Sequence, residues 1–180
     1  MILAPHDAAA ARAEAPWWPV GTTKFVVMTL GTLGIYHYYW IYGNWKRMRA
    51  REGAALSPVW RTFFAPVTVY RMFAAAAESA STAGVRPRWS AVGLAAAYFI
   101  ANVALLAAVP AWMAGPLLLL PVLPVQMTMA RVNVITAPAA PRNERFTLTD
   151  YAILAAGAAL TAGLWAEARA VDDLLQEWNP

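Results

Sequence analysis

Cysteine is absent from the 180 residues, and charged residues make up only 13% of the chain. Without a thiol the chain can form no disulfide, no thiolate metal site and no cysteine nucleophile. A soluble domain ordinarily has about 25% charged and about 45–50% apolar residues. Here the apolar share reaches 60% and falls in long runs. The composition therefore predicts an all-α protein that folds in a lipid bilayer.

The sequence also lacks the short motifs that carry catalytic chemistry. It contains no GxSxG, no HExxH and no phosphate-binding loop. The formal net charge of +4 is modest for a protein that binds nucleic acid. We therefore expect no cofactor, no metal site and no nucleic-acid partner, and the sequence does not name a reaction.

Four apolar runs are each close to the roughly 20 residues that a helix needs to cross about 30 Å of hydrocarbon. They predict membrane spans over residues 23–42, 90–109, 112–132 and 148–166. Tyr and Trp prefer the headgroup level, where the ring is in an apolar layer and its polar group meets water. The rings expected to anchor the interface are Trp17, Trp18, Tyr39, Trp40, Trp45, Trp60, Trp89, Trp112, Tyr151 and Trp165. Thr147 to Asp150 (TLTD) fits a capping box at the start of the last span.

A fifth segment, residues 57–78, has a helix-start signal in Ser57 and Pro58. Its apolar residues share one side, and its charged residues the other. The segment predicts either a fifth span or an amphipathic helix in the interface. Pro66 should bend it, because proline breaks the hydrogen-bond ladder of a helix.

Charge distribution favours the interfacial helix. If the segment lies flat, eleven of the fourteen Lys and Arg residues fall on one side of the bilayer, as the positive-inside rule requires. If it spans, Arg71 enters the lipid at a cost of about 2.5–3.5 kcal/mol. We therefore predict four transmembrane helices and one amphipathic helix on the cytoplasmic face. The domain organisation is then an outer tail over 1–22, a transmembrane domain over 23–166 and an outer tail over 167–180.

The stretch GIYHYYWIYGNWKRMRAREG, residues 34–53, joins an aromatic helix end to four basic residues within six positions. Such a junction is typical of the inner-leaflet boundary, where Lys and Arg meet anionic phosphates. Arginines also gather near the loop that follows the third span. The residues predicted to bind lipid headgroups are Lys46, Arg47, Arg49, Arg51, Arg61, Arg71, Arg131, Arg142 and Arg145.

Three polar residues lie within the predicted spans: His37, Asn102 and Gln126. His37 fits a haem ligand, a proton carrier or a pH sensor, or simply a histidine near the wet end of its helix. The two amides fit hydrogen bonds between helices, or the wall of a polar path. Pro116, Pro121 and Pro124 interrupt the third span, either as a transporter site or as an ordinary kink.

Several stretches resemble a group of small bacterial integral membrane proteins of unknown function. The resemblance rests on GIYHYYWIYGNWKRMRAREG followed by SPVWRTFFAPVTVYRMF, and on the later PVLPVQMTMARVN and PRNERFTLTD. It extends from Thr22 to about Gly157. It implies a location in the bacterial inner membrane, and it brings no activity with it.

These patterns predict a non-enzymatic inner-membrane protein, an accessory or scaffold subunit. It would bind the bilayer's anionic phospholipids and a larger membrane complex or a second copy of itself. The alternative is a small transporter, scramblase or channel subunit that uses the kinked third span. No ionisable residue is clearly central to a span, which argues against an ion-coupled carrier. A third hypothesis is a lipid-modifying enzyme with its site in the Arg131–Arg145 region, for which the sequence offers no nucleophile.

Overall fold

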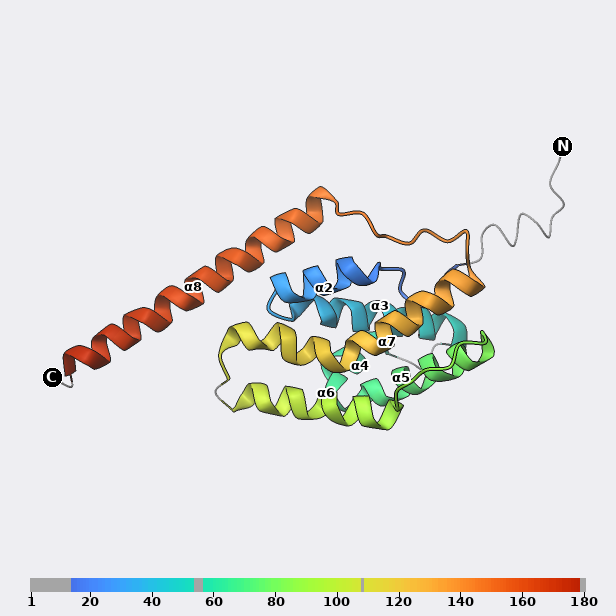
Figure 1. Ribbon diagram of the computed structural model, residues 1–180, viewed down its shortest axis with the longest axis horizontal. Coiled ribbons are helices and arrows are strands. Elements are labelled where there is room, and N and C mark those ends of the chain that lie inside the picture. The colour runs from blue at the N-terminus through green and yellow to red at the C-terminus, as the bar shows by residue number, and fades with distance from the viewer. Residues whose placement is uncertain (1–13, 54–56, 108, 179–180) are drawn as a thin grey trace.

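The computed structural model describes residues 14–53, 57–107 and 109–178. In these residues the chain is all-α, with seven α-helices and one 3-10 turn and no strand (Figure 1). The elements are α2 (Thr22–Gly31), α3 (Ile35–Glu52), α4 (Pro58–Phe63), α5 (Ala65–Thr82), α6 (Ala91–Leu106), η1 (Ala111–Met113), α7 (Ala114–Thr136) and α8 (Leu148–Trp178). The predicted all-α class is confirmed. Most of the predicted outer tail over 1–22 lies outside the described residues.

The predicted span over 23–42 is not one helix. It divides into α2 and α3 at a turn where Leu33 has φ 50° and Gly34 has φ 88°. These are left-handed backbone angles, which end a right-handed helix and which glycine adopts at low cost. The hydroxyl of Thr32 accepts a hydrogen bond from the Tyr36 amide at 2.9 Å and so begins α3. With ten residues, α2 is about 15 Å long, half of what a span needs.

The α2–α3 pair is an antiparallel hairpin. The segment before α2 therefore lies beside the C-terminal part of α3. The Trp18 amide donates to Asn44 Oδ1 at 2.9 Å, and the rings of Phe25 and Trp40 lie 5.2 Å apart. Residues 14–20 therefore lie at the end of the molecule that carries the basic stretch of α3. The sequence prediction had placed them at opposite ends, because it assumed a single continuous span between them.

The predicted helix over 57–78 is two helices with a break at Phe64. Pro66 is the second residue of α5, and it has no N–H to donate to the preceding turn. The predicted bend is confirmed, in the stronger form of a break. One face of α5, including Val69, Phe73 and Ala76, is buried in the core, and the helix packs against α6 and α7. The helix is thus part of the bundle as well as part of its surface.

The core lies between α3, α5 and α7. Its largest fully buried side chains include Trp17, Trp40, Trp45, Tyr98 and Phe73. The helix α7 runs through this core and continues past Pro121 and Pro124. The helix α6 lies at the edge of this core. It has no charged residue, and only Tyr98 and Ala101 of its sixteen residues are buried.

Two helices of the described residues are long and apolar enough to cross a membrane: α7, and α8 as far as Gln176. The prediction of four such helices is therefore wrong at two places. The first span is a hairpin, and α6 within the predicted span 90–109 has only sixteen residues, about 24 Å. Residue 108 of that span lies outside the described part of the chain.

The last helix, α8, leaves the body and extends away from it (Figure 1). Its contact with the body is close at Gly157, where an added Cβ would come within 2.0 Å of the Gly31 carbonyl oxygen. The predicted span 148–166 and the predicted tail 167–180 form a single helix as far as Trp178. Residues 179–180 are not among those described.

Candidate lipid-headgroup site

The basic stretch of α3 divides into two sides. Lys46 and Arg49 line an open hollow between α3 and α4, together with Ser57, Pro58 and Val59. In the described part of the chain, neither cation has an acidic side chain within ion-pair distance. Both side chains are exposed. They are therefore available to an anion that approaches from outside the molecule.

Arg47 and Arg51, four residues apart, face the N-terminal segment instead. Arg47 forms an ion pair with Glu14 at 2.5 Å, and the guanidinium of Arg51 lies 4.5 Å from the centre of the Trp17 ring. Partial burial lowers the pKa of Arg51, and the nearby Glu52 opposes this shift. The guanidinium remains charged at neutral pH. These two cations are already engaged within the chain.

Arg61 and Arg71 also have partners. The guanidinium of Arg61 lies 4.8 Å from the centre of the Trp45 ring. Arg71 pairs with Glu52 at 2.6 Å, and both side chains are partly exposed. An exposed pair of this kind contributes about 0–1 kcal/mol. Both arginines lie near the basic stretch of α3.

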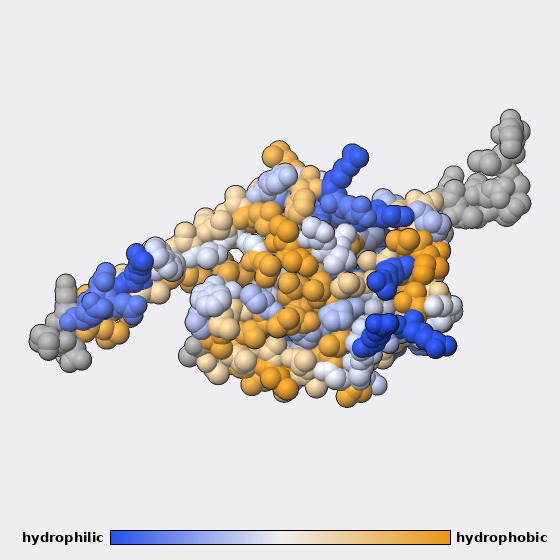
Figure 2. Space-filling model, viewed as in Figure 1, coloured by the Kyte–Doolittle hydropathy of each residue, from blue (hydrophilic) through white to orange (hydrophobic). Residues whose placement is uncertain are grey.

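The second basic region lies against the N-terminal segment. Arg131 lines a shallow hollow with Thr22 and Val85, and Arg142 lines another with Ala15 and Val20. Asn133 fixes this arrangement: its Oδ1 accepts from the Trp17 amide at 2.9 Å and its Nδ2 donates to the Trp17 carbonyl at 3.1 Å. Both basic regions therefore meet at residues 14–21. Figure 2 shows hydrophilic groups gathered at this end of the body.

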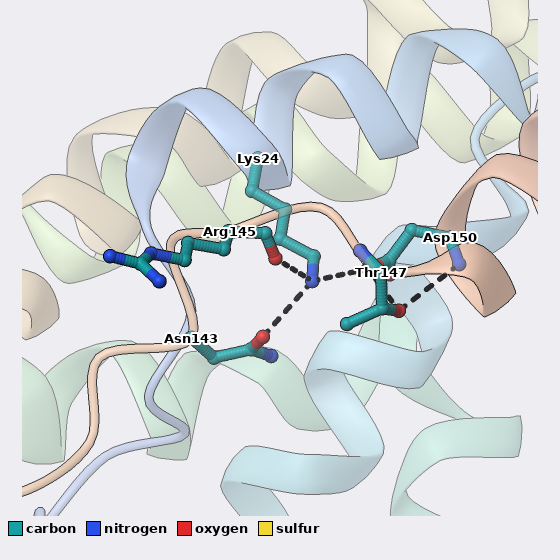
Figure 3. A network of polar contacts seen from close by, with 5 residues as sticks. All are labelled: Lys24, Asn143, Arg145, Thr147 and Asp150. Carbon is teal, nitrogen blue, oxygen red and sulfur yellow. Dashed lines mark hydrogen bonds and ion pairs between the residues drawn. The ribbon is translucent and has the colours of Figure 1, made fainter.

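A buried lysine that the sequence did not single out joins α2 to α8 (Figure 3). Lys24 is only 3% exposed, and its ammonium donates to Asp150 Oδ2 at 2.6 Å, to Asn143 Oδ1 at 3.0 Å and to the Arg145 carbonyl at 3.0 Å. An ammonium has three hydrogens, so these partners satisfy it completely. The role of Lys24 is therefore structural, and so is the role of the Arg145 backbone.

The predicted capping box at the start of α8 is confirmed and forms part of this network. The Thr147 amide and hydroxyl both donate to Asp150 Oδ2 at 2.7 Å, and the Asp150 amide donates to Thr147 Oγ1 at 3.4 Å. The sequence does contain one signal for the ion pair with Lys24. This lysine stands at the start of an apolar run, and a charge in such surroundings needs a partner.

The ten predicted interface anchors differ in how far their side chains are buried. Trp17, Trp40 and Trp45 are fully buried core residues, so the prediction is wrong for them. Trp18 and Trp89 are partly buried, and Trp89 donates to Thr128 Oγ1 at 3.0 Å. The rings that remain exposed are those of Tyr39, Trp60, Trp112, Tyr151 and Trp165. The burial follows from the α2–α3 hairpin, which encloses the aromatic end of the predicted span.

The three polar residues within the predicted spans all have hydrogen-bond partners. His37 is fully buried, with Nδ1 facing the Gly34 carbonyl and Nε2 at 2.6 Å from the Tyr98 hydroxyl. Because a carbonyl only accepts, Nδ1 carries the hydrogen and Nε2 accepts from Tyr98. Asn102 Oδ1 accepts from the Tyr38 hydroxyl at 3.2 Å. The histidine and the amide thus tie α3 to α6.

Gln126 performs a similar task in the core. Its Oε1 accepts from Trp40 Nε1 at 2.6 Å, and its Nε2 donates to the Val20 carbonyl at 2.7 Å. The residue is buried. These bonds connect α7 to α3 and to the segment before α2, so the side chain acts as a link between helices.

Comparison with protein-family models found no match, and the searches of curated proteins and of solved structures returned no significant relative. Within the described residues, no three side chains of His, Cys, Asp or Glu converge to hold a metal ion. The assignment of a function therefore rests on the surface and the contacts of this chain.

Proposed function

We propose that this chain is a small inner-membrane protein of accessory or scaffold type, which binds anionic phospholipid headgroups at its basic end. Its apolar surface supports a location in lipid. On α6 the exposed side chains include Val92, Phe99, Ile100, Val103 and Leu106. A contiguous apolar surface of this kind is unusual on a soluble monomer, since its exposure to water is unfavourable.

An exposed aromatic cluster on α4 supports a position at the headgroup level of the bilayer. The rings of Trp60 and Phe64 stack 6.0 Å apart, and Phe63 meets Phe64 edge-on at 5.0 Å. Trp60 is 64% exposed and Phe63 is 72% exposed. Large rings that face outwards beside cations fit the headgroup region of a bilayer.

One observation carries the headgroup proposal: Lys46 and Arg49 are exposed, lack an acidic partner among the described residues, and line a hollow that adjoins the groove lined by Phe63 of this aromatic cluster. A cation near an anionic surface contributes about 1 kcal/mol of binding. The accessory role is supported by His37, Asn102 and Gln126, whose side chains are hydrogen-bonded to other groups of this chain and so link its helices. We assign no reaction.

Location is tested first, by extracting membranes of the expressing cells with alkaline carbonate. The proposal expects the protein in the pellet. Its recovery in the soluble fraction would contradict a location within the membrane and with it the role proposed here.

Headgroup selectivity is tested on the full chain in mild detergent, by native mass spectrometry with equal amounts of phosphatidylglycerol and phosphatidylcholine. We expect a preference for phosphatidylglycerol. Arg49→Gln should lower that preference about fivefold, the equivalent of about 1 kcal/mol.

Arg169→Gln is the matched control for this measurement. It removes the same charge from the projecting part of α8, where the guanidinium stacks on Trp165 at 3.6 Å. The preference should not change. Equal retention of the two lipids by the unmodified chain, or equal effects of the two substitutions, would contradict the proposal.

A further inference from the structure

A second hollow adjoins the basic one and has the opposite chemistry. It is an open groove of about 600 Å³ between α3 and α4, lined by Tyr38, Tyr39, Tyr42, Val59, Thr62 and Phe63. The basic hollow measures about 450 Å³. Tyr42 and Val59 line both. The two hollows therefore form neighbouring parts of one surface.

The order of side chains along α3 produces this arrangement. Tyr38, Tyr42, Lys46 and Arg49 follow one another at spacings of four, four and three residues, so they lie on one side of the helix. The rings come first and the cations second, over a length of about 16 Å. The Lys46 ammonium lies 5.8 Å from the centre of the Tyr42 ring, at the point where the apolar part meets the basic part.

The short helix α4 supplies the other wall. It packs against α3 and presents Val59 and Phe63 to the apolar part, while Ser57 and Pro58 border the basic part. Val59 is 63% exposed and Phe63 is 72% exposed. These apolar groups lack a covering element in the described structure, so an apolar ligand would remove them from water or from loosely ordered lipid.

We propose that this composite groove holds one anionic phospholipid, with its phosphate at Lys46 and Arg49 and an acyl chain along Tyr42, Val59 and Phe63. Charge complementarity selects the occupant: the end with two exposed cations suits a phosphate, and the tyrosine end suits a hydrocarbon chain. The inference rests on the proposed function and deepens it, because it replaces general attraction to an anionic surface with a defined site for one lipid.

The geometry also separates this site from the other basic residues. Arg47 and Arg51 lie on a different side of α3 and contact Glu14 and Trp17. They contribute to the positive charge of this end without lining either hollow. A lipid that bound only through overall charge would not distinguish the two sets of cations.

The test fills the apolar part and leaves every charge in place. Val59→Trp puts a large ring into the shared wall of the two hollows. Val67→Trp is the matched control, since Val67 is also exposed, at 72%, and lines neither hollow. Both variants are compared with the unmodified full chain in mild detergent, and an unchanged unfolding midpoint confirms that each is folded.

The probe is dioleoyl phosphatidylglycerol, measured by native mass spectrometry against dioleoyl phosphatidylcholine. We expect Val59→Trp to lower retention of the anionic lipid at least tenfold and Val67→Trp to change it less than twofold. If Val59→Trp does not fold, a phosphatidylglycerol with a photoactivatable group on its acyl chain replaces the measurement. Its cross-links should map to residues 38–42 and 59–63.

The outcomes separate the two proposals. Preference for phosphatidylglycerol with equal effects of the two tryptophans, or cross-links spread over the body, overturns the groove and leaves headgroup binding in place. Equal retention of both lipids by the unmodified chain overturns headgroup binding, and the groove with it. Loss confined to Val59→Trp supports both.

Discussion

Lys24 and the pair Lys46 and Arg49 carry the same charge in opposite surroundings. Lys24 is 3% exposed, and all three hydrogens of its ammonium are donated to oxygens of the same chain. Lys46 and Arg49 are exposed and have no acidic partner among the described residues. The first cation is thus part of the framework, and the others are open to a ligand.

The difference lies in what each environment supplies. A buried ammonium is tolerated only where the protein replaces its lost water, as Asp150, Asn143 and the Arg145 carbonyl do for Lys24. An exposed cation keeps its water until an anion displaces it. Substitutions in the first environment should therefore change stability, and substitutions in the second should change binding.

The largest effect is expected from Lys24→Met. Loss of the ammonium leaves the Asp150 carboxylate with only its contacts to Thr147, and removal of one partner from a buried pair costs about 3–5 kcal/mol. We expect this loss in the free energy of unfolding, measured by detergent titration in mixed micelles. Lys46→Met, the same change at an exposed site, should cost less than about 0.5 kcal/mol. Similar losses at the two lysines would erase the contrast.

A smaller effect is expected from Asn143→Ala. The ammonium of Lys24 loses one of its three acceptors while the ion pair persists. A hydrogen bond to a charged group contributes about 1.5–3 kcal/mol, so the free energy of unfolding should fall by that amount. Arg142→Ala, one residue earlier on the same loop and exposed, serves as its control and should have little effect. A loss as large as that of Lys24→Met would show that Asn143 has a further role.

The double substitution Lys24→Met with Asp150→Leu should be milder than Lys24→Met alone. Replacement of both members of a buried pair by apolar groups is often close to neutral, although the loss of the capping box retains a cost of about 0.5–2 kcal/mol. Unfolding of the two single variants and the double variant gives the coupling energy directly. Additive losses would mean that the two charges do not depend on one another.

The smallest change in stability is expected from Lys46→Gln with Arg49→Gln. The free energy of unfolding should change by less than about 0.5 kcal/mol, while the preference for phosphatidylglycerol falls.

Added salt should also separate the exposed cations from the buried one, because the screening length drops from about 10 Å at 0.1 M to about 3 Å at 1 M. Binding at the exposed cations should weaken with added salt, and unfolding should respond far less. Salt-independent binding would argue against a role for these charges.

The local chemistry of the chain was predictable where it depends on a few neighbouring residues. The capping box of α8 follows from Thr147 and Asp150, and the break before α5 follows from Pro66. The location of both basic regions near one end also agrees with the charge distribution of the sequence. For the capping box and the helix break the signal is short in range, so no knowledge of distant contacts is required.

The first predicted span shows where such reasoning stops. Residues 23–42 have the length and the rings of a membrane helix, yet Leu33 and Gly34 turn the chain back on itself. The hairpin is stabilised by contacts between distant residues, including Asn133 with Trp17 and Gln126 with Val20. Hydropathy contains no information about these bonds. The burial of Trp17, Trp40 and Trp45 could not be predicted for the same reason.

The sequence by itself determined that this chain is helical and rich in apolar residues, with four of its cations gathered within residues 46–51, because composition and local spacing are sufficient for those properties. Only the tertiary structure decided which cations bind groups of the same chain and which remain exposed on its surface. That choice depends on partners more than a hundred residues away, as Asp150 is from Lys24. It also depends on the packing of α4 against α3, which places Val59 and Phe63 beside Lys46 and Arg49 and so forms the composite groove.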